Sequence, residues 1–221
     1  MSNVLAFTCT HLPYEDKRAL DFTQRIRDAY KCDKIVMLGD LVDNHSISYH
    51  DKDPDLWSPK SEMDKVDKKL QKWFKAFPKL TLCRGNHDML VDRKAKTAGL
   101  PKRAFKSFRE IWNLPKGWKD VWETQIDGVK YQHGTGFSGK YGHIKAAEVN
   151  MQSTVIGHLH SICGVQWMEN SKKAIFGMAV GCLINKNSMA YAYGKDHNRK
   201  SILGAGVVTD GGKNPRPVKM F

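Results

Sequence analysis

The sequence predicts an α/β fold in which two packed, mixed β-sheets are flanked by helices. Two observations favour it. Within residues 4–38, a buried strand, an amphipathic helix and a second buried strand follow one another, which is the pattern of a parallel βαβ unit. After residue 120, short strands joined by turns replace this alternation and indicate hairpins. The 221 residues are enough for one substantial core, so we expect a single domain spanning residues 1–221.

The first half of the chain contains the alternating strands and helices. Apolar runs at residues 4–7, 34–38 and 80–83 are typical of buried strands, because each is short and ends at polar or glycine residues. Between them, residues 15–30 and 61–77 place their apolar side chains on one stripe at helical spacing. Ser61 is the expected N-cap of the second helix, and Pro78 ends it.

The second half is dominated by short strands. Asp127-Gly128 is a strong turn signal, and it predicts a hairpin between residues 121–126 and 129–133. No strand is expected at residues 89–119, where a short helix is predicted at 103–112. The remaining predictions are a helix at 144–151, a strand ending at Gly157, and strands at 163–168, 173–178 and 204–209.

Composition limits the class of protein. No apolar run approaches the roughly 18 residues of a membrane span and the N-terminus lacks the pattern of a signal peptide, so we expect a cytoplasmic protein without a membrane partner. Five cysteines without CxxC spacing argue against a disulfide framework. The net charge of +13 favours polyanionic partners, which makes nucleic acid a candidate, although solubility alone is an equally good reason for it. The oligomeric state is not predicted.

Polar clusters follow the predicted strands, at the point where each strand ends. They read Cys9-x-His11, Gly39-Asp40-x-x-Asp43, Gly85-Asn86-His87-Asp88, His133 and Gly157-His158-x-His160. Open α/β sheets place their ligands at the carboxyl ends of strands, so these side chains are expected to share one site. Imidazole, carboxylate and amide donors suit Mn²⁺, Zn²⁺ or Fe better than Ca²⁺ or Mg²⁺. The sequence therefore predicts a transition-metal site.

This series resembles the calcineurin-like metallophosphoesterases, whose motifs run D-x-H, G-D-x-x-D, G-N-H-[DE], H and G-H-x-H. Four of the five motifs are intact and in order between residues 9 and 160. The resemblance implies a four-layer αββα sandwich with two divalent metal ions, bridged by Asp40 and by one water or hydroxide. It assigns the remaining ligands to two sites, with Cys9, His11 and His160 at one and Asn86, His133 and His158 at the other.

Phosphate-ester cleavage needs a nucleophile at neutral pH and relief of charge on phosphorus, and two metals about 3.5–4 Å apart supply both. The resemblance implies that His87 contacts the substrate and protonates the leaving oxygen. Asp43 is expected to orient His87 or a metal-bound histidine. Arg84 and Asn86 are further candidate substrate contacts, and a salt bridge at the sheet edge is an equally good interpretation of Arg84.

Cys9 departs from the family pattern, because it stands where the first motif has its aspartate. As a thiolate ligand it would favour Zn²⁺ or Fe over Mn²⁺, since sulfur is a softer donor. The alternative is a weakened or empty first site. We favour ligation because every other ligand of both sites is present.

These residues favour a binuclear phosphodiesterase acting on nucleic acid or a nucleotide, because the motifs lack the G-D-x-x-D-R-G and G-N-H-E patterns of the protein Ser/Thr phosphatases. The alternatives are a phosphomonoesterase and a non-catalytic interaction scaffold on the same fold. Residues 92–119 hold nine Lys or Arg against two acids, interleaved with aromatic residues. That segment either binds a single-stranded nucleic acid or packs its aromatic side chains into the core.

Overall fold

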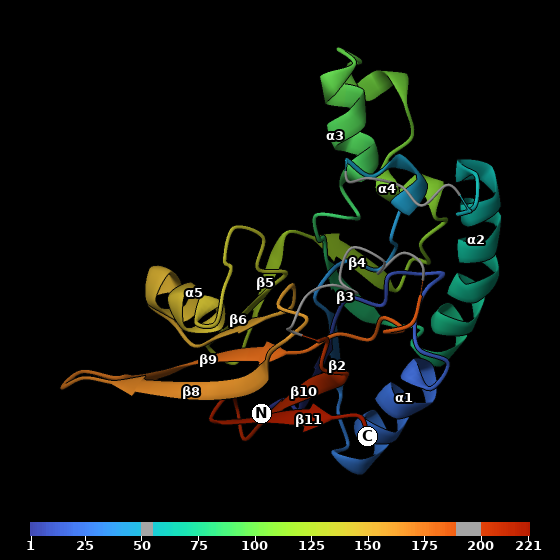
Figure 1. Cartoon of the computed structure of the whole chain (residues 1–221). Helices are drawn as coiled ribbons and strands as arrows, with labels where there is room; N and C mark the ends of the chain where they lie inside the picture. The colour runs from blue at the N-terminus through green and yellow to red at the C-terminus, as the bar shows by residue number, and fades with distance from the viewer. Residues whose placement is uncertain (50–54, 189–199) are drawn as a thin grey trace.

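Two β-sheets lie face to face in the computed structural model, which describes residues 1–49, 55–188 and 200–221 (Figure 1). The first sheet has the strand order β11-β10-β1-β2-β3-β4. Its strands are β1 (Val4–Phe7), β2 (Lys34–Met37), β3 (Leu80–Cys83), β4 (Trp118–Val121), β10 (Gly204–Thr209) and β11 (Asn214–Lys219). The order β5-β6-β7-β9-β8 makes the second sheet. Its strands are β5 (Glu123–Ile126), β6 (Val129–Gln132), β7 (Thr154–Ile156), β8 (Cys163–Glu169) and β9 (Ala174–Val180).

Both sheets are mixed. The strand β1 pairs in parallel with β2 and antiparallel with β10, and β7 pairs in parallel with β6 and β9. The described α-helices are α1 (Ala19–Ala29), α2 (Pro59–Ala76), α3 (Leu90–Thr97), α4 (Phe108–Ile111) and α5 (Gly142–Asn150), with short 3-10 turns η1 (His45–Ile47) and η2 (Lys102–Ala104). None of the helices in the described ranges is long and apolar enough to cross a membrane.

The alternation of side chains along the strands builds the layers. In β1, Leu5 and Phe7 pack with the buried faces of α1 and α2, whereas Val4 and Ala6 face the second sheet. On the far side of the second sheet, Ala146 of α5 packs against residues of β7 and β9. The order of layers is therefore helices, sheet, sheet, helix, and the predicted α/β fold with two mixed sheets flanked by helices is confirmed.

Several boundaries differ from the prediction. The helix expected to begin at Ser61 begins at Pro59 with Ser58 as its N-cap, because proline suits the first helical position. The chain forms α3 where no helix was expected. The helix predicted at residues 103–112 is reduced to η2 and α4, because the capping box of Ser107 and Glu110 starts a new helix.

Two strands also depart from the prediction. The single strand expected at residues 121–126 is divided at the exposed Trp122, where the chain passes from β4 in one sheet to β5 in the other. The edge strand β11 was not predicted, because Pro215 and Pro217 lie within it. Proline is tolerated in an edge strand, where an N–H that faces solvent is not needed.

The packing of α2 gives a test of the core. Leu70 is completely buried beneath the first sheet, whereas Lys72 on the same helix is exposed. We expect Leu70→Ala to lower the free energy of unfolding by roughly 2–5 kcal/mol, because it removes buried methyl groups and leaves a cavity. Urea unfolding followed by circular dichroism measures it. A loss no larger than that of the control Lys72→Ala would contradict this packing.

Candidate metal centre

The predicted ligands lie together because the strands that precede them are neighbours. The strands β1, β2 and β3 are adjacent and parallel, so the loops after them leave the same edge of the first sheet. The strands β6 and β7 are likewise parallel neighbours in the second sheet. A hydrogen bond joins the two edges, since His133 Nδ1 after β6 donates to the carbonyl oxygen of Leu38 after β2 at 2.6 Å.

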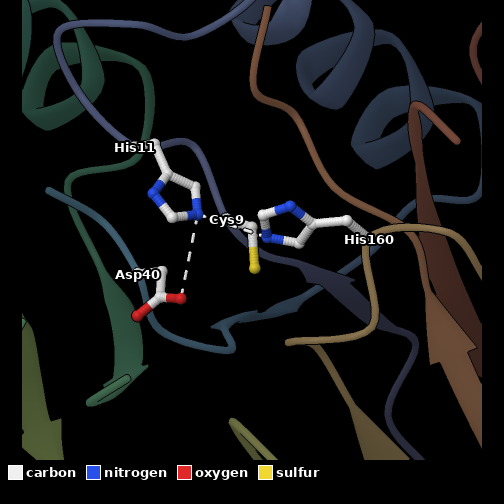
Figure 2. Close-up of side chains that lie close together, drawn as sticks. All are labelled: Cys9, His11, Asp40 and His160. Carbon is white, nitrogen blue, oxygen red and sulfur yellow. Dashed lines mark hydrogen bonds and ion pairs between the residues drawn. The ribbon is translucent and has the colours of Figure 1, made fainter. Parts of the chain in front are cut away.

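One donor group combines the first two strand ends with the loop after β7. The donor atoms of Cys9, His11, Asp40 and His160 all lie within 4.8 Å of one another. Figure 2 shows these four side chains directed toward a common centre. His11 Nε2 is 3.3 Å from His160 Nε2 and 3.8 Å from Asp40 Oδ2. These three donor atoms are therefore close enough to one another to ligate a single cation.

A second donor group shares Asp40 with the first. The donor atoms of Asp40, His133 and His158 also lie within 4.8 Å of one another. His133 Nε2 is 3.2 Å from Asp40 Oδ2 and 3.0 Å from Asn86 Oδ1. The resemblance assigned Asn86, His133 and His158 to one metal and Cys9, His11 and His160 to the other. In the structure, Cys9, His11 and His160 share one donor group with Asp40, His133 and His158 share the other, and Asn86 lies beside His133.

Hydrogen bonds on the far side of the imidazole rings fix their orientation. His11 Nδ1 donates to Asp43 Oδ1 at 2.6 Å, and His87 Nδ1 donates to the carbonyl oxygen of Asp43 at 2.7 Å. In His11, as in His133, Nδ1 is thereby occupied and Nε2 faces the donor group. This arrangement is usual for metal-binding histidines, because the second hydrogen bond sets the tautomer and the direction of the ring.

The charges of the site also suit a cation. Burial works to raise the pKa of Asp40, but the imidazoles of His133, His87 and His11 outweigh it and hold the pKa well below its usual range. Burial, and next the neighbouring His133, lowers the pKa of His158 to about 4. The site therefore offers an ionised carboxylate beside a neutral imidazole, and metal binding requires both protonation states.

The backbone at the ligands is bent in an uncommon way. Cys9, His11, Asp40 and His158 all have left-handed backbone angles, with φ between 48° and 62°. Residues other than glycine adopt this region infrequently, and such residues cluster at functional sites. Close approach adds a second constraint, because a Cβ atom at Gly85 would lie 2.2 Å from Asp40 Oδ1. Only glycine fits against the shared carboxylate there.

Cys9 is completely buried and directed into the first donor group. Its Sγ lies 3.1 Å from Thr8 Oγ1. Burial, and next the charge of Asp40, raises the pKa of the thiol well above its usual value. A coordinated cation acts in the opposite direction, because it deprotonates a thiol that ligates it. The thiol thus occupies the position of the missing carboxylate, and the donor set fits a cation that accepts sulfur and nitrogen.

Two buried carboxylates support the site and were not assigned a role from the sequence. Asp88 accepts hydrogen bonds from the N–H groups of Asp40 at 2.9 Å, Gly85 at 2.8 Å and Val42 at 3.2 Å, and so ties the loops after β2 and β3 together. Burial, and next Asp40, raises the pKa of Asp88 to about 7. The motif that contains Asp88 was the only sequence signal for this function.

The other carboxylate is Glu62, which lies in the first turn of α2. It accepts the N–H groups of His45 at 2.8 Å and Ser46 at 2.9 Å, and so fixes η1 beside Asp43. Acidic residues are common in the first turn of any helix, so the sequence carried no signal for this contact.

Four histidines belong to none of the five motifs. A histidine outside any motif is ordinarily a polar surface or loop residue, but His45 and His143 are buried, and His45 Nδ1 lies 3.6 Å from Asp43 Oδ2. His50 and His197 lie outside the described residues. The guanidinium of Arg84 makes two hydrogen bonds to Asp120, at 2.7 and 2.6 Å. This is the salt bridge that the sequence left open, and a contact of Arg84 with substrate stays a prediction.

The comparison with protein families identifies the class. The model of the calcineurin-like phosphoesterases matches residues 2–205. The chain therefore belongs to the calcineurin-like phosphoesterase family, and the predicted family is confirmed. A comparison with curated proteins gives no match.

Solved structures show distant likenesses. Vps29 from Cryptosporidium parvum is 13% identical, covers 99% of this chain and 97% of that chain, and has a TM-score of 0.44. A single mutant of Vps29 from Entamoeba histolytica is 10% identical, covers 99% of each chain, and has a TM-score of 0.43. YfcE, a phosphoesterase from E. coli, is 13% identical, covers 94% of this chain and 88% of that chain, and also has a TM-score of 0.43. Likenesses this weak are too distant to inform the site.

If Cys9 is a ligand, Cys9→Ser should weaken one of two bound metals while leaving the fold intact, because a hydroxyl is a poorer donor than a thiolate. Metal content per chain after dialysis against graded chelator concentrations measures this. Cys182→Ser is the matched control, since Cys182 is also completely buried but belongs to no donor group in the described part of the chain. Equal metal retention in the two variants would contradict ligation by Cys9.

Proposed function

We propose that the protein is a metal-dependent phosphodiesterase that hydrolyses a P–O bond of a nucleic acid or nucleotide at the two donor groups around Asp40. The observation that carries this proposal is that Asp40 belongs to both groups. Two cations held there would acidify a water at neutral pH and neutralise charge on the phosphoryl oxygens. Mn²⁺, Zn²⁺ and Fe all suit the donors, and sulfur from Cys9 favours Zn²⁺ or Fe.

His87 is proposed to donate a proton to the leaving oxygen. Its Nδ1 is bonded to the carbonyl oxygen of Asp43, so Nε2 is the nitrogen left for the substrate. Burial works against protonation of His87, but the carboxylates of Asp40 and Asp43 outweigh it and raise the pKa. A raised pKa increases the protonated fraction near neutral pH, which a general acid requires.

Asp43 is proposed to position two imidazoles at once. One of its oxygens, Oδ1, accepts the hydrogen bond of His11 at 2.6 Å and lies 3.5 Å from His87 Nδ1. A single carboxylate thereby links a proposed metal ligand to the proposed acid, and it fixes the separation between them.

A basic cavity beside the centre supports a substrate with more than one phosphate. Lys140, Lys200 and Ser161 line a cavity of about 470 Å³, and Ser161 directly follows His160. Ammonium groups attract phosphate as point charges. Phosphates that neighbour the scissile one in a nucleic acid or nucleotide would meet this cavity.

The residues beside His87 favour a diester. Asn44 follows Asp43 at the position where the protein phosphatase motif has arginine, and its Nδ2 donates to the carbonyl oxygen of His87 at 3.1 Å. A monoester carries an additional negative charge, which bidentate arginine contacts commonly neutralise. Arg84, the arginine nearest to the site in the sequence, is bound to Asp120.

Removing the proposed acid tests this account. We expect His87→Ala to lower kcat for a thymidine dinucleotide by about 10²–10⁴-fold, the usual contribution of general acid catalysis, because its alkoxide leaving group needs a proton that p-nitrophenolate does not. Turnover is measured with added Mn²⁺, Zn²⁺ or Fe²⁺, and His143→Ala serves as the control for loss of a buried histidine. A folded His87→Ala variant with wild-type kcat would exclude the proposed acid.

The proposed substrate class is tested by comparing esters of the same leaving group. We expect kcat/KM to be higher for bis-p-nitrophenyl phosphate than for p-nitrophenyl phosphate. The reverse order, or turnover of a phosphopeptide, would favour a phosphomonoesterase. Folded protein that hydrolyses neither ester with any of the three metals would instead support the interaction scaffold.

A further inference from the structure

An apolar groove lies beside the loop that carries His87, between α3 and the segment 99–105 that follows it. The groove has a volume of about 500 Å³, and its apolar lining includes Met89, Leu100 and Phe105. Leu100 is 52% exposed, so its side chain is accessible at the surface of the groove. Figure 1 shows α3 projecting from the body of the molecule rather than packing on a sheet.

Positive charge surrounds this apolar lining. Arg93, Lys96 and Lys102 contribute to the groove, and Asp92 is the only acidic residue among those described as lining it. Arg84 Nη1 lies 3.5 Å from Asp92 Oδ2, so the negative charge of that carboxylate is already partly compensated. The groove therefore combines apolar surface with excess cationic groups, and it suits a ligand that combines a flat apolar part with negative charge.

The groove starts at the proposed site of catalysis. Met89 is the second residue after His87, and α3 begins at the next position. From Leu90 to Lys96 the helix rises about 9 Å, at 1.5 Å per residue. Tyr49 holds this helix to the loop after η1, because its Oη lies 3.1 Å from Thr97 Oγ1 and its ring lies beneath the guanidinium of Arg93 at 5.0 Å.

We infer that this groove binds a single-stranded nucleic acid next to its scissile phosphate, an assignment that rests on the proposed phosphodiesterase function. A base would lie against Phe105, Met89 and Leu100, since bases stack on aromatic and apolar side chains without regard to sequence. The flanking phosphates would meet Lys96 and Lys102. An acidic peptide shares the charge but not the flat rings spaced by phosphates, and the phosphate chemistry next to the groove favours nucleic acid.

This assignment divides the aromatic residues of segment 92–119 into two classes. Phe108, Trp112 and Trp118 are buried in the core, and the indole nitrogen of Trp118 donates to the carbonyl oxygen of Phe77 at 2.7 Å. Phe105 is only partly buried and lines the groove. Three of the four are therefore anchors, and Phe105 is the one available for stacking.

The groove is tested by the binding of a fluorescent oligothymidylate of ten nucleotides. Binding is measured by fluorescence anisotropy, with EDTA present to prevent hydrolysis. We expect Phe105→Ala to weaken binding about tenfold. The double variant Lys96→Glu with Lys102→Glu should weaken it further and reduce the slope of log Kd against log salt by about 1.4, since each lost phosphate contact on a single strand removes about 0.7. Its matched control is Lys68→Glu with Lys72→Glu, which changes the net charge equally on the exposed face of α2.

Hydrolysis of bis-p-nitrophenyl phosphate is measured on the same proteins, and we expect all these variants to retain wild-type rates because the small diester does not reach the groove. Equal loss of oligonucleotide affinity in both double variants, or wild-type affinity in Phe105→Ala, would overturn the groove assignment. Diester hydrolysis without oligonucleotide binding would overturn it while leaving the proposed function standing. Groove-dependent binding by a protein that hydrolyses no diester with any metal would overturn the proposed function alone.

Discussion

A single buried carboxylate, Asp40, determines how the rest of the site is arranged. An ionised carboxylate in a protein interior is very costly unless opposite charge or hydrogen bonds compensate it. Here His133 lies 3.2 Å from it, and the N–H group of His87 donates to it at 2.9 Å. Two sets of donors therefore converge on one anion, and two cations bound there would compensate its negative charge. The loops that supply these donors all direct their side chains toward Asp40.

The fold makes this convergence possible by bringing together loops from two sheets. Parallel strands end at one edge, so β1, β2 and β3 deliver their loops side by side, and β6 and β7 deliver theirs opposite. The fit between the two edges is close, since a Cβ atom at Gly157 would lie 2.1 Å from Thr8 Oγ1. Left-handed bends at Cys9 and His158 then turn their side chains into the shared space. The loop after β3, which contributes Asn86 and His87 to the site, continues directly into α3. The groove along α3 therefore lies next to this edge of the sheet.

The sequence predicted the polar residues that directly follow strands. It did not predict contacts between elements that are distant in the chain. The clustering of polar side chains around Asp40 was predicted because apolar runs ended before each of them, and parallel strands share an edge; their roles as ligands of two metals came from the family resemblance. The contact between Glu62 and η1 joins two elements whose proximity no local pattern reveals. The strand β11 was not predicted because it contains two prolines. The division at the exposed Trp122 into two strands of different sheets was not predicted either, because no turn residue marks it. Short α3 was missed because its basic residues obscure its apolar stripe.

The most direct test of the account is anomalous diffraction from crystals grown with Mn²⁺ or Zn²⁺, recorded above and below the absorption edge of the metal. The account predicts two anomalous peaks about 3.5–4 Å apart, the separation of binuclear hydrolytic sites, with Asp40 in contact with both. One peak should lie beside Cys9, His11 and His160, and the other beside Asn86, His133 and His158. A single peak, or two peaks that Asp40 does not bridge at saturating metal, would contradict it.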